Sequence, residues 1–407
     1  MKPESPSSPP PPVADAKERS KLNPVRWIRS EAQSELNPVE SAVLLIIRIA
    51  LVLAVLYLFL VSIGMMGAGF KIFGKDFAKA LIQTTNNPFV GLFVGIFVTA
   101  LIQSSSTTTS MVVAFVAAGT ISVENAVPVI MGANIGTAVT SALVSLGHVA
   151  RKRAFERAFA GAMVHDMFNL LAVIVFLPLE LSTRYLSRAA AALSGLLAGT
   201  GGLEFKSPLK VVTQPASKLV IDSISALGFG KVTTGVIIVA LSFLLLIFSL
   251  IFLTKLLKVL VFGKLQRFFE ESMYSSGYIA ILIGVMFTAL VQSSSVTTSL
   301  MIPLAAAGIM TLEQVYPVAL GANVGTTVTA LLASLATGRP EALTIALVHL
   351  LFNLSGIALF FPIPALRRIP IRAARFLASI VTKNRFYGVI FILVLYFLLP
   401  GLAILAT

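Results

Sequence analysis

The chain has no cysteine among its 407 residues. This absence excludes a disulfide framework and any metal site built on thiolates. Charged residues are also few, at 12%, whereas an ordinary soluble domain has about 25%. Hydrophobic residues make up 57% of the chain, and the mean hydropathy is +0.93. The composition therefore predicts an integral membrane protein and excludes an ordinary soluble domain.

A run of polar side chains interrupts an apolar stretch at Gln103-Ser104-Ser105-Ser106. Each apolar flank, 89–102 and 111–118, is shorter than the roughly 20 residues that a spanning helix needs. The pattern predicts a re-entrant hairpin with a polar tip inside the membrane. Non-helical backbone survives at that depth only when it is buried in protein or lines a cavity. A solvated binding site is therefore expected at this tip.

The same pattern recurs 189 residues later, where Thr288 to Ser299 repeats Thr99 to Ser110. One cluster of small hydroxyls could serve only to pack helices, but an internal repeat signals architecture. Two further motifs recur with the hairpin. The sequence Gly-Ala-Asn-x-Gly-Thr occurs at 132–137 and 321–326, and a His and an Asn four residues apart occur at 165–169 and 349–353.

These patterns predict an all-α polytopic membrane protein with two inverted-topology repeats. Each repeat holds a re-entrant hairpin, a broken transmembrane helix and a further transmembrane helix. The predicted order is a disordered cytoplasmic tail (1–38), a first span (42–63), a connector and repeat 1 (64–179, with hairpin 89–118, broken helix 128–147 and helix 154–179), an outer connection with a linking span (180–261), repeat 2 (278–361, with hairpin 278–309, broken helix 317–337 and helix 341–361), and a basic loop with a last span (365–405).

The inversion follows from counting, because a hairpin returns to its own face and each repeat has two full crossings. One linking span then makes the second repeat enter from the opposite face, as in many secondary transporters. Twenty of the 31 Lys and Arg fall on the predicted face of the N-terminal tail and ten on the other. This bias predicts a cytoplasmic N-terminus and a C-terminus outside the cytoplasm. It also explains the net charge of +14 without a nucleic-acid partner.

The two tips would bring together neutral hydroxyl and amide groups, which can donate to an anion or accept at a cation. Helix N-termini at the tips favour an oxyanion. Unwound backbone around Asn134 and Asn323 would offer carbonyls to a hard cation such as Na⁺. Alternatively, the glycines beside them only permit close helix packing. Asp166, a carboxylate within a span, is a candidate cation ligand; the alternative is a salt bridge to a loop residue such as Arg157.

His165 and His349 occupy repeat-related positions, which favours a structural hydrogen bond made twice over a ligand role. A transition-metal site is not expected, because the sequence has no third ligand at a useful spacing from the histidines. No other cofactor is expected.

A resemblance to a known family comes from three features: the duplicated Gln-Ser-Ser-Ser, the segment Ala158 to Asn169 and the sequence Ile369-Pro370-Ile371-Arg372. These features resemble the type II sodium-dependent phosphate cotransporters. The likeness covers about 42–405.

This resemblance implies Na⁺-coupled uptake of inorganic phosphate by alternating access, through a bacterial protein of the inner membrane that is not an enzyme. An acid at the position of Asp166 implies electrogenic transport, with several Na⁺ per divalent phosphate. A dimer is possible. The implied phosphate-binding residues are Ser104, Ser105, Ser106, Ser293, Ser294 and Ser295. The implied sodium-binding residues are Gln103, Gln292, Thr107, Thr108, Thr297, Thr298, Asn134, Asn323, Asp166, Asn169 and Asn353.

Three alternatives stay open at this point. The substrate could be another anion, such as sulfate or a dicarboxylate, because neutral hydroxyls discriminate tetrahedral oxyanions poorly. An intramembrane hydrolase would need a base within reach of a Ser, although the chain lacks a Gly-x-Ser-x-Gly elbow. A phosphate sensor would bind the anion without Na⁺-dependent flux.

Overall fold

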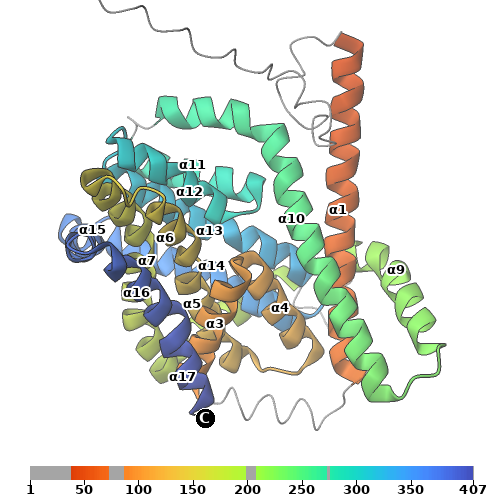
Figure 1. Cartoon of the computed structure of the whole chain (residues 1–407). Coiled ribbons are helices and arrows are strands. Elements are labelled where there is room, and N and C mark those ends of the chain that lie inside the picture. Colours follow the sequence, from red (N-terminus) through yellow and green to blue (C-terminus); the bar gives the residue numbers. More distant parts are fainter. Residues whose placement is uncertain (1–37, 73–86, 199–207, 273–275, 407) are drawn as a thin grey trace, which may run out of the picture. The chain divides into compact units, whose positions relative to one another are not determined.

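The described part of the structure is built from helices alone. A computed structural model describes residues 38–72, 87–198, 208–272 and 276–406, and its regular elements are all helical (Figure 1). In this part of the chain, seven helices are long and apolar enough to cross a membrane. The predicted all-α polytopic class is thus confirmed. The predicted disordered tail lies outside the described residues except for Pro38.

The chain divides into two units, Met1–Ala50 and Leu51–Thr407. The first contributes only the beginning of the long helix α1 (Pro38–Ile72) to the described residues. All further description concerns the second unit. There, the later half of α1 runs antiparallel to α10, with Val55 beside Leu253 and Gly69 beside Val239.

Two short helices form the first hairpin, and Asn87 starts it by accepting a hydrogen bond from the Phe89 N–H at 3.0 Å. Gly119, with a φ of 75°, ends it in the left-handed region that glycine adopts readily. The elements here are α3 (Pro88–Ile102), α4 (Ser105–Ala118), α5 (Val123–Gly136), α6 (Ala138–Leu146) and α7 (Lys152–Thr183).

The predicted polar connection 180–230 contains two helices. The elements are α8 (Tyr185–Ala198) and α9 (Pro208–Ser225), followed by α10 (Lys231–Ser272). The carboxylate of Glu180 starts α8 by accepting from the Leu186 N–H at 2.7 Å and from the Ser187 N–H at 3.3 Å. An anion at a helix N-terminus satisfies the unpaired N–H groups of the first turn.

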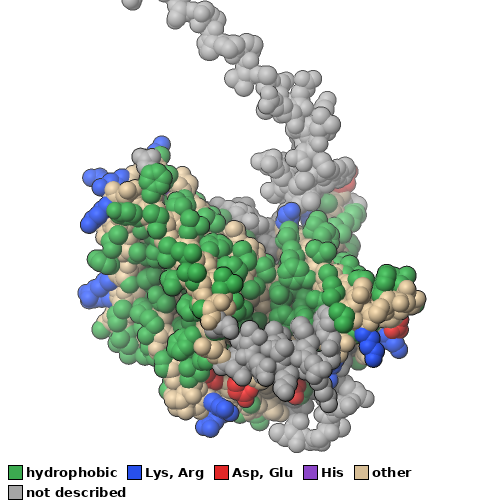
Figure 2. Space-filling view, turned by 60° about the horizontal axis from the view of Figure 1, so that its bottom comes forward, with side chains coloured by type: hydrophobic (Ala, Val, Ile, Leu, Met, Phe, Trp, Pro, Cys, Tyr) green, Lys and Arg blue, Asp and Glu red, His purple; other side chains and the backbone are tan. Residues whose placement is uncertain are grey.

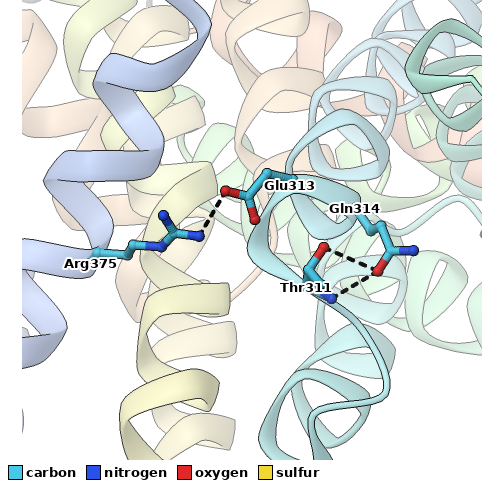
Figure 3. A network of polar contacts seen from close by, with 4 residues as sticks. All are labelled: Thr311, Glu313, Gln314 and Arg375. Carbon is cyan, nitrogen blue, oxygen red and sulfur yellow. Dashed lines mark hydrogen bonds and ion pairs between the residues drawn. The ribbon is translucent and has the colours of Figure 1, made fainter.

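The second half repeats the order hairpin, long helix, long helix. Its elements are α11 (Gly277–Val291), α12 (Ser294–Ala307), α13 (Leu312–Thr337) and α14 (Pro340–Phe360). A capping box opens α13, with the Gln314 side chain accepting from the Thr311 N–H at 2.8 Å. Beside it, Glu313 forms an ion pair with Arg375 at 2.7 Å (Figure 3). This start is therefore fixed by polar contacts as well as by packing.

The predicted basic loop 365–385 is wrong, because most of it is an amphipathic helix. The elements after α14 are α15 (Pro364–Val381), α16 (Arg385–Leu393), the π-helical turn η3 (Val394–Leu398) and α17 (Leu399–Leu405). Ile371, Ala374 and Ala378 recur at helical spacing and are buried, while Arg372 and Arg375 are exposed on the other side. This 3.6-residue periodicity of one apolar face is what forms a helix from a basic sequence.

The predicted unwinding of the Gly-Ala-Asn-x-Gly-Thr segments is also wrong. α13 is continuous through 321–326, and the interruption between α5 and α6 is the single residue Thr137, which keeps helical dihedral angles. A Cβ atom on Gly132 would collide with the Leu92 carbonyl oxygen, and one on Gly321 would collide with that of Ile281. The glycines therefore let α5 pack on α3, and α13 on α11, at backbone contact. The close-packing alternative holds.

Hydrophobic side chains also cover much of the molecular surface. Figure 2 shows them over most of one face, with Lys and Arg gathered at its margins. Leu244, Phe248 and Ile251 of α10, for example, are 46–65% exposed. Contiguous exposed apolar surface of this kind marks a membrane or protein contact. Together with the seven apolar helices, it is what a multi-pass membrane protein requires.

Candidate functional site

The tip of the first hairpin is a tight reversal between α3 and α4. Gln103 has a φ of 55°, and its N–H donates to the Thr99 carbonyl at 2.7 Å. Ser104 is the N-cap of α4, and its hydroxyl accepts from the Thr107 N–H at 3.2 Å. The hydroxyls of Thr99 and Thr108 close the base of the tip at 3.0 Å. The polar sequence thus forms the reversal itself.

The tip of the second hairpin has the same construction. Gln292 has a φ of 56°, and its N–H donates to the Thr288 carbonyl at 2.7 Å. Ser293 caps α12, and the Thr288 and Thr297 hydroxyls lie 2.7 Å apart. A positive φ is uncommon for a residue other than glycine. In the described part of the chain, the non-glycine residues with a positive φ are Gln103, Gln292 and Arg184. Strained backbone of this kind clusters at functional sites.

One hydroxyl joins the two tips. Thr329 of α13 donates to the Gln292 amide oxygen at 2.7 Å, and its hydroxyl lies 3.5 Å from that of Ser106. A second link joins Ser141 of α6 to Thr298 of α12 at 2.7 Å. All of these side chains except Gln292 are at most 5% exposed, and Gln292 is 7% exposed. The structure therefore brings Ser106 of the first hairpin and Gln292 and Thr298 of the second into one buried polar region, whereas the predicted site residue Gln103 is exposed.

This region contains hydroxyls with unused hydrogen-bonding capacity. Thr140 occupies the position equivalent to Thr329 in the first repeat. Its hydroxyl is buried and has no hydrogen-bond partner among the described residues, as is also true of Ser110 and Ser299. A buried polar group without a partner is costly. The unused hydroxyls are therefore available to a polar ligand or water.

Four asparagines and two histidines form a second, fully buried network. His349 donates to the Asn134 amide oxygen at 3.0 Å, and the Asn134 amide nitrogen donates to Asn353 at 3.1 Å. In the related half, His165 contacts the Asn323 amide oxygen, and Asn323 donates to Asn169 at 2.7 Å. Each triad joins a helix of one repeat to a helix of the other.

The two triads are themselves linked, because the Asn169 amide donates to the Asn134 carbonyl at 2.9 Å. The histidines therefore make the duplicated structural bond that the sequence predicted. Both bond through Nε2 to an asparagine, and neither ring hydrogen-bonds a serine within the described residues. The described residues therefore contain no Ser–His hydrogen bond.

Asp166 lies apart from both networks. Its side chain is fully buried on α7, and the neighbouring polar group with which it interacts is the Tyr396 hydroxyl of η3. Neither group makes a hydrogen bond of normal geometry to a described residue. The alternative prediction, a salt bridge between Asp166 and Arg157, is wrong. Among the described residues the ion pair joins Arg375 to Glu313, and neither carboxylate oxygen of Asp166 has a hydrogen-bond partner. A buried carboxylate without a cationic partner is expensive.

Thr329, Ser141 and Tyr396 contribute to these contacts but are not among the residues predicted from the sequence. Thr329 had a signal, because Thr140 and Thr329 recur at the same 189-residue offset as the tips. Ser141 is replaced by Ala330 in the second repeat, so the repeat could not identify it. Tyr396 lies outside both repeats, and only the packing of the last span against α7 brings it to Asp166.

Comparison with known proteins identifies the family. A family model described as Na⁺/Pi-cotransporter matches residues 58–204 and 245–372. Sodium-dependent phosphate transport protein 2A of Rattus norvegicus is 35% identical over 428 residues, covering 88% of this chain and 67% of the relative. Sodium-dependent phosphate transport protein 2B of Homo sapiens is 33% identical over 443 residues, covering 87% of this chain and 64% of the relative. No solved structure matches. The chain belongs to the Na⁺/Pi-cotransporter family.

Proposed function

We propose that this protein is a Na⁺-coupled cotransporter of inorganic phosphate that works by alternating access. The observation that carries the proposal is the meeting of the two hairpin tips, where Ser106 and Gln292 share the Thr329 hydroxyl. A neutral, hydroxyl-rich site built from two halves can hold an anion and its coupling cations together. The family and its named relatives supply the substrate.

The two repeats run in opposite directions across the membrane in this proposal. Within each repeat, the first hairpin helix packs parallel to the long helix, as Gly95 beside Ala133 and Gly284 beside Gly321 indicate. The long helices of the two repeats, α5 and α13, run in opposite directions. Ala117 at the end of α4, just before α5, shares a cavity wall with Ala336 at the end of α13. Two helices that begin at opposite ends of one core support an inverted repeat.

Phosphate would bind at the N-termini of α4 and α12, where unpaired N–H groups and the positive ends of the helix dipoles face the tips. The proposed ligands are Ser104, Ser105, Ser106, Ser293, Ser294 and Ser295. Sodium would take hydroxyl, amide and carboxylate oxygens. The proposed ligands are Gln103, Gln292, Thr107, Thr108, Thr297, Thr298, Asn134, Asn323, Asp166, Asn169 and Asn353.

Asp166 would make transport electrogenic. A buried carboxylate without a cationic partner favours binding of a cation, and an additional Na⁺ beside it would move net charge with each divalent phosphate. Replacing it with glycine, as Asp166→Gly, should make transport electroneutral. Phosphate uptake that remains equally sensitive to membrane potential in this variant would contradict the assignment.

The remaining assignments belong to the same proposal. The protein would reside in a bacterial inner membrane, in contact with lipid, with a cytoplasmic N-terminus and its C-terminus on the other side. It would act as a transporter and not as an enzyme, with Na⁺ as coupling ion, without another cofactor or nucleic acid, and with a dimer as a possible assembly.

Uptake of radiolabelled phosphate into proteoliposomes tests the function directly. An inward Na⁺ gradient should drive uptake that an equal K⁺ gradient does not, and Gln103→Ala and Gln292→Ala should each reduce it. Excess unlabelled sulfate or dicarboxylate should compete weakly. Strong competition by either anion would mean that the substrate is wrong. Phosphate binding without Na⁺-dependent flux would mean that the protein is a sensor.

A further inference from the structure

A cavity with both polar and apolar walls lies at the ends of several helices, away from the hairpin tips. Its volume is about 300 Å³, and its walls come from the last turns of α1, α4 and α13, from α9, and from the residue before α14. Lys71, Lys218 and Arg339 line it, and none of its described lining residues is acidic. Lys218 and Arg339 therefore place positive charge in its walls, and the cavity belongs to none of the networks described above.

The side chains around the cavity suit a small oxyanion. The guanidinium of Arg339 can contact two oxygens of one phosphate at once, while the Lys218 ammonium acts as a point charge. The Gln214 side chain adds an uncharged amide donor to the same wall. Arg339 and Lys218 are exposed to solvent, so water and salt weaken their attraction for an anion. Such a site binds weakly and exchanges quickly.

Two helices connect this cavity with the hairpin tips. α4 leads from Ser106 to Ala117, and α13 leads from Thr329 to Ala336, with each alanine in the cavity wall. At about 1.5 Å per helical residue, these paths are roughly 16 Å and 10 Å long. An anion in the cavity therefore lies about two to three helical turns beyond the polar region that both tips share.

The position of the cavity also agrees with the charge pattern of the sequence. Lys71 comes from the segment 64–88 and Lys218 from the segment 180–232. The predicted topology assigns both segments, together with Arg339, to one outer face. These segments carry the smaller share of the Lys and Arg residues. Lys218 and Arg339 therefore bring positive charge to one cavity on a face that carries few Lys and Arg residues.

We propose that this cavity is an outer vestibule that collects small divalent oxyanions, phosphate among them, and delivers them to the hairpin tips. The proposal rests on the proposed function. Cations around a narrow opening raise the local concentration of an anionic substrate. The vestibule therefore lowers the phosphate concentration needed for half-maximal uptake, and it does not act on the later steps.

The test is Na⁺-driven phosphate uptake by the double variant Lys218→Gln/Arg339→Gln in proteoliposomes. We expect the KM for phosphate to rise about three- to tenfold at low ionic strength, with the maximal rate and the KM for Na⁺ unchanged. Added choline chloride should shrink the difference from wild type, because it screens exposed charges. Lys218→Arg/Arg339→Lys keeps the charge and should retain most of the affinity.

Lys231→Gln is the matched control, because Lys231 is an exposed lysine of the same predicted face that does not line the cavity. An unchanged KM in the double variant, or an equal rise in the control, would overturn the vestibule and leave the proposed function intact. Wild-type protein that takes up no phosphate under a Na⁺ gradient would overturn both. Normal size-exclusion profiles will show that each variant is folded.

Discussion

Thr329 is the position at which one hydroxyl group can be tested for its role in joining the repeats. Thr329→Val removes that hydroxyl and keeps the shape of the side chain. Gln292, which is 7% exposed, then loses the donor that now lies 2.7 Å from its amide oxygen. Leaving a buried acceptor without its partner costs about 1–3 kcal/mol. This free-energy cost destabilises the contact in which Thr329 joins Gln292 of one tip to Ser106 of the other.

The expected result is a fall in kcat/KM for Na⁺-driven phosphate uptake. A cost of about 1–3 kcal/mol corresponds to roughly a 5- to 150-fold effect. Labelled phosphate uptake, measured at several phosphate and Na⁺ concentrations, gives this value directly. Because Gln292 and Ser106 belong to different hairpins, both the phosphate and the Na⁺ dependence should change.

Thr326→Val is the matched control for this prediction. Thr326 is also buried on α13, but among the described residues its hydroxyl bonds only to the Ala322 carbonyl of its own helix, at 2.9 Å. Loss of such a back-bond is nearly neutral. We expect uptake within about twofold of wild type. Equal losses in the two variants, or wild-type uptake by Thr329→Val, would refute the idea that this hydroxyl couples the tips.

Three further predictions concern the framework and the buried acid. Gly321→Ala should lower the unfolding free energy in detergent by about 1–3 kcal/mol, because the added Cβ collides with α11; Gly195→Ala, with open space around it, should not. Asn323→Ala should lower the unfolding free energy by about 2–4 kcal/mol, because His165 and Asn169 both lose a buried hydrogen-bond partner. An unchanged thermal unfolding midpoint would contradict this prediction. Tyr396→Phe removes the hydroxyl that neighbours Asp166. It should change the Na⁺ concentration for half-maximal uptake several-fold and leave the phosphate KM unchanged. An unaltered Na⁺ dependence of uptake would show that Asp166 is not part of the cation site.

The hairpins could be predicted from the sequence because their signals are local. A polar run between two apolar stretches that are too short to span a membrane has few other structures available to it. Serine is also a typical N-cap residue, so Ser104 and Ser293 specify where the second helix of each hairpin begins. The repetition of the run then gave the architecture of the second half without further information.

The roles of the glycines could not be predicted, because glycine permits both a helix break and a close helix contact. What decides between them at Gly132 and Gly321 is a neighbouring backbone, on α3 and α11, that passes within reach of the missing Cβ. Likewise, Asn134 bonds to α14 and Asn323 to α7, each in the opposite repeat. Only tertiary packing selects these partners.

The central claim is that both repeats build one site, and a cysteine pair tests it most directly. The chain contains no cysteine, so Ser141→Cys/Thr298→Cys would introduce the two thiols alone, at side chains whose hydroxyls lie 2.7 Å apart. Mild oxidation followed by peptide mapping would detect a disulfide, which needs Cβ atoms within about 4.5 Å. The account predicts rapid, nearly complete cross-linking of α6 to α12 in the membrane. A pair that stays reduced, while both single variants are folded, would contradict it.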